Sequence, residues 1–479
     1  MARDSEHNKN IAFGHDNWGI RRMSRVRENN IAIGDRRRQP RTGGANLSVV
    51  DLFCGAGGLS EGFRQAGFNV LAGSDNDPDA LATFAANFPK ARAVLGDLRQ
   101  DTIKEQILDA ARQAAVLVGG PPCQAFSQMR NHTRMIDDPR NALYREFVGM
   151  LRAALPPAFV MENVTGMDQM GVREQILSDL LLDGEYDVQA QVVDAADFGV
   201  PQTRKRLLFV GVRRGSGMTT PLLRGSGATD SVVLARFTGD RRPRYQLVVQ
   251  QNLLSMRLAE ALADSNDLTA VTAAQAISDL ADLPVGNRHD DLRWSELPEP
   301  SSAYQRLMRT DPRESAFNLQ VPRINKDTEL RLCGIPQGGN HRDLREELLG
   351  RYLTGQRWGQ DNGSGKLSRK HFYAYRRLHP ALWAWTLNTK ADCIYHYEIP
   401  RALSVREMAR LQSFPDRFVF VSDPRRGLLE GRHDGGPAHS RYRQVGNAVP
   451  PLLAKNVAQS LMIALNASRE QEKIRAKAG

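Results

Sequence analysis

Between Leu47 and Gly211 the sequence repeatedly places a short apolar run before a polar or glycine-rich turn, and a helical stretch often follows. The apolar runs cover residues 47–53, 69–74, 91–95, 115–118, 158–161 and 206–211. Strands that alternate with helices in this way predict an α/β fold with a doubly wound, mostly parallel sheet. In such a sheet, ligands bind beyond the carboxyl ends of the strands. The polar residues next to these runs are therefore the first candidates for a functional site.

The rest of the chain divides into three parts around this pattern. Residues 1–46 form a basic, Arg-rich arm that we expect to be poorly ordered. After residues 47–211, residues 212–400 begin with a Gly- and Ser-rich linker and continue as an irregular second domain. Residues 401–479 contain a capped helix near Ser404 and a long terminal helix, so we expect them to rejoin the first domain.

Charge and cysteine usage narrow the class of protein. Lys and Arg total 65 against 54 Asp and Glu, and a net charge of +11 favours a polyanionic partner, although basic proteins without a nucleic-acid role have a similar balance. The four cysteines are far apart with no C-x-x-C pair, so we expect free thiols and no metal. No apolar run approaches the roughly 20 residues that span a bilayer, and no signal peptide is indicated. The sequence predicts a cytoplasmic protein without a membrane segment.

The turn after the first apolar run carries Gly55 and Gly57, a spacing found in nucleotide-binding loops and in many other strand-to-helix turns. Asp75 lies 20 residues after Gly55, at the end of the next run, where a carboxylate can accept both hydroxyls of a ribose. Asp97, after the third run, can accept the amino group of an adenine. No basic residue is at hand to bind a pyrophosphate, so an adenosine ligand without phosphates fits better than NAD. Helix capping is the alternative for both aspartates.

The turn after the fourth run places Cys123 on a proline-stiffened segment. A lone cysteine is usually an inert small apolar residue. Here, however, Glu162 and Asn163 end a neighbouring run, and the segment that contains Arg204 and Arg206 opens another. A thiolate, a carboxyl group and guanidinium groups at one sheet edge combine a nucleophile, a proton donor and an anion stabiliser.

These residues resemble the motifs of the C5-cytosine DNA methyltransferase family, in the family's order and over most of the chain. The matching segments are the cofactor loop Asp51–Ser60, the nucleophile motif Pro121–Gln124, the glutamate motif Met161–Val164, the Q-x-R-x-R motif Gln202–Arg206, the helix motif Arg406–Asp416 and the closing motif Arg443–Pro451. The arm and most of residues 213–382 lie outside the match. The resemblance implies a Rossmann-like, S-adenosylmethionine-dependent domain, a smaller target-recognition domain within residues 212–400, and a site-specific DNA methyltransferase of a prokaryotic restriction-modification system.

The resemblance also assigns roles to residues. Cys123 adds to C6 of cytosine and makes C5 nucleophilic, while Glu162 protonates N3 with support from Asn163. Arg204 stabilises the thiolate and contacts O2, and Arg206 holds the site together. Cys54, in the cofactor loop, is given no catalytic role. The implied cofactor-binding residues are Phe53, Gly55, Gly57, Gly58, Leu59, Asp75, Asn76, Asp97, Leu98, Pro121, Asn447 and Ala448.

Attack on C6 requires access to the face of the ring, so the target base must leave the duplex. The residues expected at the DNA are Gln124, Ser127, Gln128, Arg130, Gln202 and Thr386. We expect double-stranded DNA as the partner of a monomeric enzyme, with a cognate restriction endonuclease acting on the same site. Two alternatives are a tRNA methyltransferase of the same family, against which the long insert after Gly211 argues, and a catalytically silent DNA-binding homologue, against which the intact motif residues argue.

Overall fold

The computed structural model describes residues 47–122, 142–166, 172–226, 271–310, 314–349, 375–422 and 436–478. The chain divides into two units, Met1–Ala45 and Asn46–Gly479, and all described residues lie in the second unit. The basic arm predicted for residues 1–46 falls outside the described residues. The predicted division of the remainder into a catalytic and a recognition domain stays a prediction.

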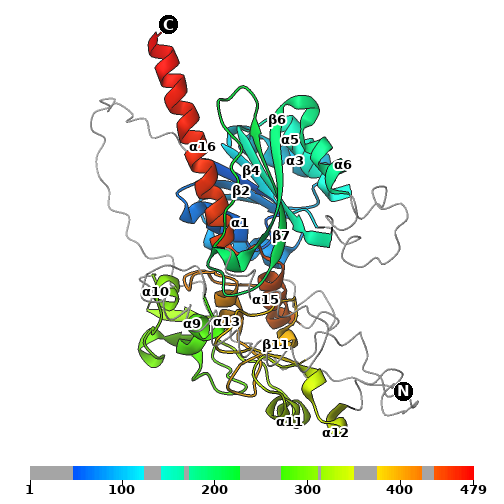
Figure 1. Ribbon diagram of the computed structural model, residues 1–479, viewed down its shortest axis with the longest axis vertical. Helices are drawn as coiled ribbons and strands as arrows, with labels where there is room; N and C mark the ends of the chain where they lie inside the picture. The colour runs from blue at the N-terminus through cyan, green and yellow to red at the C-terminus, as the bar shows by residue number, and fades with distance from the viewer. Residues whose placement is uncertain are drawn as a thin grey trace, which may run out of the picture. The chain divides into compact units, whose positions relative to one another are not determined.

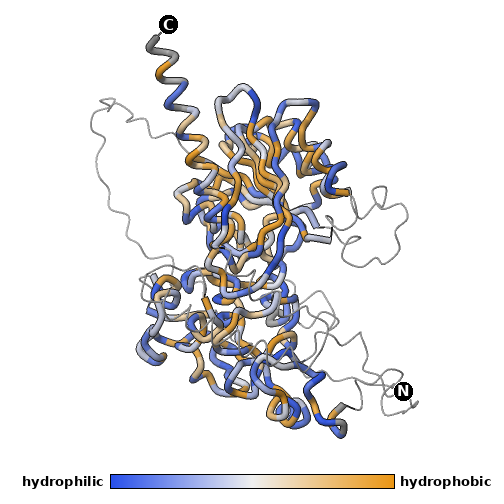
Figure 2. Tube along the Cα trace, in the orientation of Figure 1, coloured by the Kyte–Doolittle hydropathy of each residue, from blue (hydrophilic) through white to orange (hydrophobic). Residues whose placement is uncertain are grey.

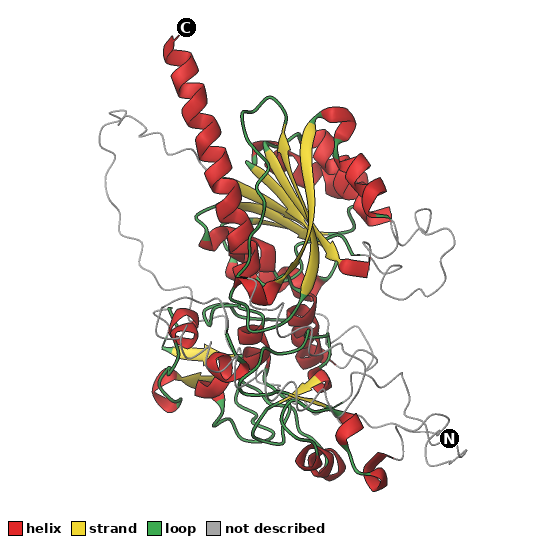
Figure 3. Cartoon of the chain, in the orientation of Figure 1, coloured by secondary structure: helices red, strands yellow, loops and turns green. Residues whose placement is uncertain are grey.

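A seven-stranded sheet in the order β3-β2-β1-β4-β5-β7-β6 forms the centre of this unit (Figures 1 and 3). Its strands are β1 (Ser48–Leu52), β2 (Asn69–Asp75), β3 (Arg92–Leu95), β4 (Val116–Gly119), β5 (Ala158–Val164), β6 (Tyr186–Asp194) and β7 (Lys205–Arg213). The pairs β1–β2, β2–β3, β1–β4 and β4–β5 are parallel, whereas β7 runs antiparallel to β5 and β6. The doubly wound, mostly parallel sheet is confirmed.

Strand β6 was not among the predicted strands. It lies at the edge of the sheet, and its sequence YDVQAQVVD mixes polar with apolar residues. An edge strand is not buried on both faces, so it need not contain the continuous apolar run by which the other strands were found.

The reversed direction of β7 has a consequence for the site. The carboxyl ends of β1, β2, β4 and β5 meet at one edge of the sheet, because these strands are parallel. The antiparallel strand β7 begins at that same edge, where Arg206 pairs in register with Val164 at the end of β5. The predicted arginine motif thus reaches the strand ends that carry the other motifs.

Helices cover both faces of the sheet (Figure 1). On one face lie α1 (Gly58–Gln65), α2 (Pro78–Asn87) and α16 (Pro451–Ala478), and on the other lie α3 (Asp101–Gln113), α5 (Ala142–Ala154) and α6 (Arg173–Leu180). Successive strand residues alternate between the two cores, so that Val116 and Val118 face the first helices and Leu117 faces the second. Apolar residues accordingly concentrate along the strands in Figure 2.

The described residues between 271 and 422 form short elements, as the irregular sequence predicts. The helices are α9 (Ala273–Ile277), α10 (Ala303–Met308), α11 (Lys326–Gly334), α12 (Glu346–Leu349) and α13 (Val405–Leu411), and the strands are β8 (Asp291–Arg293), β9 (Ser315–Phe317), β10 (Arg376–Arg377) and β11 (Ile394–Tyr395). Helix α15 (Gly436–Asn447) then leads to α16. The predicted capped helix is α13, in which the Ser404 side chain and Glu407 form a capping box.

A cluster of buried arginines lies on helix α13 and in the segment before it. Arg401, Arg406 and Arg410 have no exposed surface. Arg401 forms a bidentate ion pair with Glu407, with both N···O distances 2.9 Å. Arg410 binds Asp279 at 3.0 Å and Asp416 at 2.6 Å, which ties α13 to the segment after α9. We call Arg401, Arg406, Arg410, Glu407, Asp279 and Asp416 the arginine cluster; each ionic group in it has a partner within the protein.

One stretch, His439–Ser468, is long and apolar enough by composition to cross a membrane. Of its most apolar window, 61% is buried inside the protein, mainly against the sheet face that α1 also covers. A core helix passes the same test of length and composition, so this finding is weak evidence for a span.

Candidate active site

The loop after β1 is held by the next strand end. Gly55 donates its backbone N–H to Oδ2 of Asp75 at 2.8 Å, and Cys54 donates to the carbonyl of Ser74 at 2.9 Å. Gly57 has a φ of 98°, a conformation that glycine adopts without strain, and it begins α1. No heavy atom lies within 4 Å of the position that a Cβ on Gly55 would occupy. The loop therefore borders open space beside the Asp75 carboxylate.

Two carboxylates beneath this loop, the fully buried Asp51 and the half-buried Asp75, form no ion pair with the described residues. Asp51, within β1, has no exposed surface; its Oδ2 accepts from the Ser60 hydroxyl at 2.7 Å, and its Oδ1 has no hydrogen-bond partner among the described residues. Burial raises the pKa of Asp51 to about 7, although the hydrogen bonds from Ser60 oppose the shift. Burial also raises the pKa of Asp75, against hydrogen bonds from Asp77 and Gly55. Asp51 was not among the predicted site residues, yet an acid inside an apolar strand was a signal for it.

The other predicted cofactor residues follow the neighbouring strand ends. Phe53 is half-buried in the loop, Leu59 is buried in the first turn of α1, Asn76 is exposed after β2, and Leu98 is buried after β3. Asp97 pairs with Arg99, whose Nε lies 3.0 Å from the carboxylate, and this interaction lowers the pKa of Asp97. Asp97 also accepts the backbone N–H of Arg99 in a local turn, and it does not cap α3, whose N-cap is Gln100.

The closing motif lies against the cofactor loop. A Cβ on Gly58 would stand 2.2 Å from the carbonyl oxygen of Val449, so only glycine permits this approach. Asn447 ends α15 with an exposed side chain, and Ala448 is half-buried. The structure therefore brings the segments predicted to bind the cofactor, 53–59, 75–76 and 447–448, to one region.

On the other side of β1, the carboxylate of Glu162 meets an arginine. Arg206 Nε lies 2.5 Å from Glu162 Oε1, and each side chain is only 12% exposed. A Cβ on Gly120 would lie 3.0 Å from Glu162 Oε2, which places the carboxylate beside the turn that leads to residue 123. The Asn163 side chain donates to the carbonyl of Pro121 at 3.2 Å and so holds the same turn against β5.

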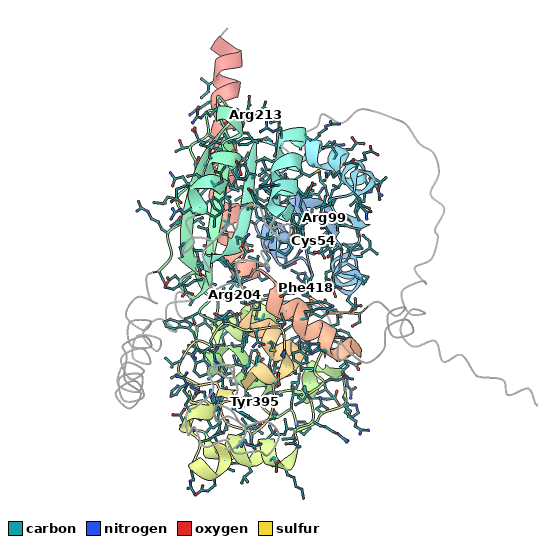
Figure 4. The ribbon with its side chains drawn as sticks, turned by 90° about the vertical axis from the view of Figure 1, so that its right-hand side faces the viewer. Cys54, Arg99, Arg204, Arg213, Tyr395 and Phe418 are labelled. Carbon is teal, nitrogen blue, oxygen red and sulfur yellow. The ribbon has the colours of Figure 1, made fainter. Side chains whose placement is uncertain are left out.

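Arg204 and Arg206, the two arginines of the Q-x-R-x-R motif, have different partners in the structure. Arg204 is 3% exposed; it donates to the carbonyls of Leu387 at 3.1 Å and Gly446 at 2.8 Å (Figure 4). Burial, followed by the like charge of Arg206, lowers the pKa of Arg204. Arg204 thus joins three segments of the described chain, whereas Arg206 pairs with Glu162. The roles predicted for the two arginines at the thiolate and the base stay predictions.

The predicted contact of Gln202 with DNA stays a prediction, and in the structure this side chain is bonded within the protein. Its side chain has no exposed surface; the amide donates to the Leu411 carbonyl at 3.2 Å and accepts from the Leu387 N–H at 2.8 Å. A buried amide with these partners is a structural tie. Thr386 is exposed, and its hydroxyl donates to the Thr203 carbonyl at 2.7 Å. Cys123, Gln124, Ser127, Gln128 and Arg130 lie outside the described residues.

The residues around the cofactor loop fit S-adenosylmethionine. This ligand carries two positive charges, a sulfonium and an ammonium, and a ribose with two hydroxyls. The unpartnered Oδ1 of Asp51 and the unpartnered hydroxyl of Ser74 are both buried polar atoms beside the loop. The carboxylates of Asp51 and Asp75 supply negative charge and acceptors. Across the described residues, no group of three His, Cys, Asp or Glu side chains is arranged to hold a metal ion.

Comparison with known proteins identifies relatives over most of the chain. The type II methyltransferase M.AgeI of Thalassovita gelatinovora is 31% identical over 471 residues, covering 88% of this chain and 100% of the relative. The type II methyltransferase M.NgoPII of Neisseria gonorrhoeae is 36% identical over 419 residues, covering 87% of this chain and 95% of the relative. Among solved structures, a prophage-encoded protein of Escherichia coli described as a DNA modification methyltransferase matches with a TM-score of 0.59 at 23% identity, covering 88% of this chain and 99% of that one, and it supports the fold.

The family model described as C-5 cytosine-specific DNA methylase matches residues 47–462, which include the strand-end loop beside Asp75, the Glu162–Arg206 pair and the closing motif. The order of the motifs, the sheet that gathers them and this match agree. The chain belongs to the C-5 cytosine-specific DNA methylase family.

Proposed function

We propose that this chain methylates C5 of a cytosine flipped out of a specific site in double-stranded DNA, with S-adenosylmethionine as the methyl donor. It acts as a monomer in the bacterial cytoplasm and protects host DNA from a cognate restriction endonuclease. The type II methyltransferases to which it is similar support this setting. The bound cofactor would supply an electrophilic methyl group, held by the loop 53–58, Asp51, Asp75 and residues 447–448.

In the proposed mechanism, the Cys123 thiolate forms a bond from Sγ to C6, and the electron pair of the C5–C6 double bond becomes available at C5. Negative charge otherwise accumulates on N3 and O2 of the ring. Glu162 delivers a proton to N3, and Arg206 donates to O2. Once C5 carries the methyl group, the C5 proton leaves to water and the C6–S bond breaks, which regenerates the thiolate. N3 returns its proton to Glu162, so the acid is also regenerated.

The observation that carries this assignment is the Glu162–Arg206 pair at 2.5 Å beside Gly120. Without a base in the site, the guanidinium satisfies the carboxylate. A flipped cytosine would present N3 and O2, which lie on the same side of the ring, to these two side chains. Arg204 cannot take this role in the described arrangement, because carbonyl groups of Leu387 and Gly446 occupy its guanidinium.

Covalent trapping tests the proposal. Fluorine at C5 cannot leave as a cation, so the enzyme should remain bonded to C6 after methyl transfer. Pooled duplex DNA with 5-fluorocytosine in place of cytosine, incubated with S-adenosylmethionine, should give a denaturant-stable adduct. Fluorinated tRNA, treated in the same way, serves as the competing substrate. Adduct on tRNA alone, or on neither substrate, would contradict the proposal.

Two cysteine variants make the trap specific. Cys123→Ala should give no adduct. Cys54→Ala should still give one, because Cys54 is buried and its pKa is raised by that burial, which disfavours the reactive thiolate. Bisulfite sequencing of host DNA from cells that express the chain would then identify the recognition sequence.

A further inference from the structure

Gln412, directly after α13, is a fully buried amide in contact with several distant segments. Its Nε2 donates to the carbonyl of Val445 at 3.0 Å and to that of Ala448 at 2.8 Å. Its Oε1 accepts from the Gln202 amide. Both ends of the side chain are therefore used, and they bind segments more than 200 residues apart in the sequence.

The Nε2 end of the Gln412 side chain fixes the closing motif beside the cofactor loop. Ala448 follows α15 and directly precedes Val449, whose carbonyl approaches Gly58 so closely that no Cβ fits. The hydrogen bond to Ala448 thus sets where the closing motif meets the cofactor loop. The next residue, Ser413, reinforces the position, because its hydroxyl accepts the N–H of Leu452 at 3.0 Å.

The Oε1 end of the Gln412 side chain connects, through Gln202, to the segment that binds Arg204. Gln202, bonded to Gln412, also accepts the N–H of Leu387, and the Leu387 carbonyl accepts from Arg204. Arg204 lies two residues before Arg206, the partner of Glu162. A second contact joins the closing motif directly to the segment that contains Leu387, because a Cβ on Gly446 would stand 2.2 Å from the Asn388 carbonyl oxygen.

We propose that Gln412 is a positioning residue. It sets the closing motif against the cofactor loop and, through Gln202, aligns Arg204 and Arg206 with that loop. This inference rests on the proposed function, because it takes S-adenosylmethionine as the ligand of the loop. It predicts that the loss of one buried amide changes ligand affinity as well as stability.

The test compares two buried glutamines in the full-length protein. Gln412→Met keeps the volume of the side chain but removes its hydrogen bonds. Gln305→Met is the matched control: Gln305 is also fully buried, donates to Ser278 Oγ at 2.8 Å and accepts from the Ser301 N–H at 2.7 Å, but it joins α10 to α9 away from the cofactor loop. By calorimetry, Gln412→Met should weaken S-adenosylmethionine binding by about tenfold, and Gln305→Met should leave it unchanged.

A second variant keeps the test decisive if Gln412→Met does not fold. In Gln412→Glu, the new buried carboxyl group can donate to a carbonyl while protonated and repels both carbonyls once ionised. Its S-adenosylmethionine affinity should therefore fall as the pH rises, whereas in the parent the ionisation of Asp51 and Asp75 favours the cationic ligand at higher pH.

The outcomes separate this inference from the proposed function. A parent protein that binds no S-adenosylmethionine would overturn both. A parent that binds it, together with folded Gln412 variants of unchanged affinity and pH profile, would overturn the positioning role alone. Equal weakening in Gln305→Met would also overturn it, because that result marks a general effect of lost stability.

Discussion

Two fully buried carboxylates of this protein, Glu407 in the arginine cluster and Asp51 beneath the cofactor loop, have pKa values shifted in opposite directions. In the arginine cluster, burial acts to raise the pKa of Glu407, but the paired Arg401 and its hydrogen bonds outweigh that effect, and the pKa is lowered. Beneath the cofactor loop, burial raises the pKa of Asp51 to about 7, because only Ser60 opposes it. Both carboxylates are fully buried. Glu407 has an arginine partner, whereas Asp51 is bonded to the neutral Ser60 and forms no ion pair with the residues that the structure describes.

This difference indicates what each region is for. A buried charge without a partner is costly, so a fold that retains one generally uses it. The arginine cluster is complete within the protein and holds α13 in place. The carboxylates beneath the loop have no cationic partner in the described part of the chain, and a sulfonium or ammonium ligand would provide one. Glu162 is an intermediate case: it is paired with Arg206, but at the edge of the sheet, where both remain 12% exposed.

The largest expected effect is on stability, in the arginine cluster. Glu407→Gln leaves Arg401 buried without its counter-ion, and we expect a loss of about 3 to 5 kcal/mol in the free energy of unfolding, measured with denaturant. Because the folded-state pKa of Glu407 is lowered, its contribution is present above the ordinary glutamate pKa and is lost as the pH falls below it. Glu296→Gln, in an exposed capping box with Arg293, is the control and should change little. Equal losses in the two variants would remove the contrast between buried and exposed pairs.

A substitution in the Glu162–Arg206 pair should lower the rate of catalysis. Glu162→Gln keeps the shape of the side chain but removes the acid, so turnover should fall by about 10²-fold or more, with S-adenosylmethionine affinity unchanged. Steady-state kinetics on DNA of the identified sequence, with calorimetry of the cofactor, measures both quantities. A parallel loss of cofactor affinity would place Glu162 with the cofactor-side carboxylates instead.

A substitution of Asp75, one of the carboxylates beneath the cofactor loop, should weaken binding of the cofactor. Asp75→Ala should weaken S-adenosylmethionine binding by about 1.5 to 3 kcal/mol, the usual contribution of a hydrogen bond to a charged group. Calorimetry of the folded variant measures this change. Unchanged affinity would mean that Asp75 only caps the loop through Gly55 and Asp77.

The smallest effect concerns Asp51 in the ligand-free protein. Because its folded-state pKa is raised, the stability associated with its protonated form is present at low pH and is lost as the pH rises through about 7. Asp51→Asn should therefore stabilise the ligand-free protein at pH values above that range by about 1 to 2 kcal/mol, less than the full linkage value because Ser60 loses a charged acceptor. Thermal unfolding at several pH values, with and without S-adenosylmethionine, measures it. A variant that is less stable than the parent at every pH would show that Asp51 has a counter-charge after all.

The sequence was sufficient to find most strands and the loops at their ends. Runs such as residues 158–161 are continuous and apolar because their strands are buried on both faces, and this pattern is local. The edge strand β6 was missed because its sequence mixes polar with apolar residues and contains no such run. Asp75 was found because an acid after a second apolar run needs no knowledge of distant contacts.

The roles of the arginines could not be found in this way. In an R-x-R spacing, both side chains lie on the same face of an extended chain, so the spacing alone cannot tell which of them meets Glu162. Pairing with β6 begins at Lys205, which leaves Arg204 outside the strand and turned toward Leu387 and Gly446. The partners of Gln202 could not be found from the sequence either, since Leu387 and Leu411 come from segments about 200 residues away.

The sequence by itself therefore determined the α/β class, the strand-end motifs and the family, because each depends on residues close together in the chain. Only the tertiary structure decided that Arg206 rather than Arg204 pairs with Glu162, that Asp51 is buried without a cation, and that Gln412 joins the two sides of the site. These properties depend on which distant groups satisfy each polar atom once water is excluded. Hydrogen bonding and burial of that kind are set by packing, which local sequence patterns do not specify.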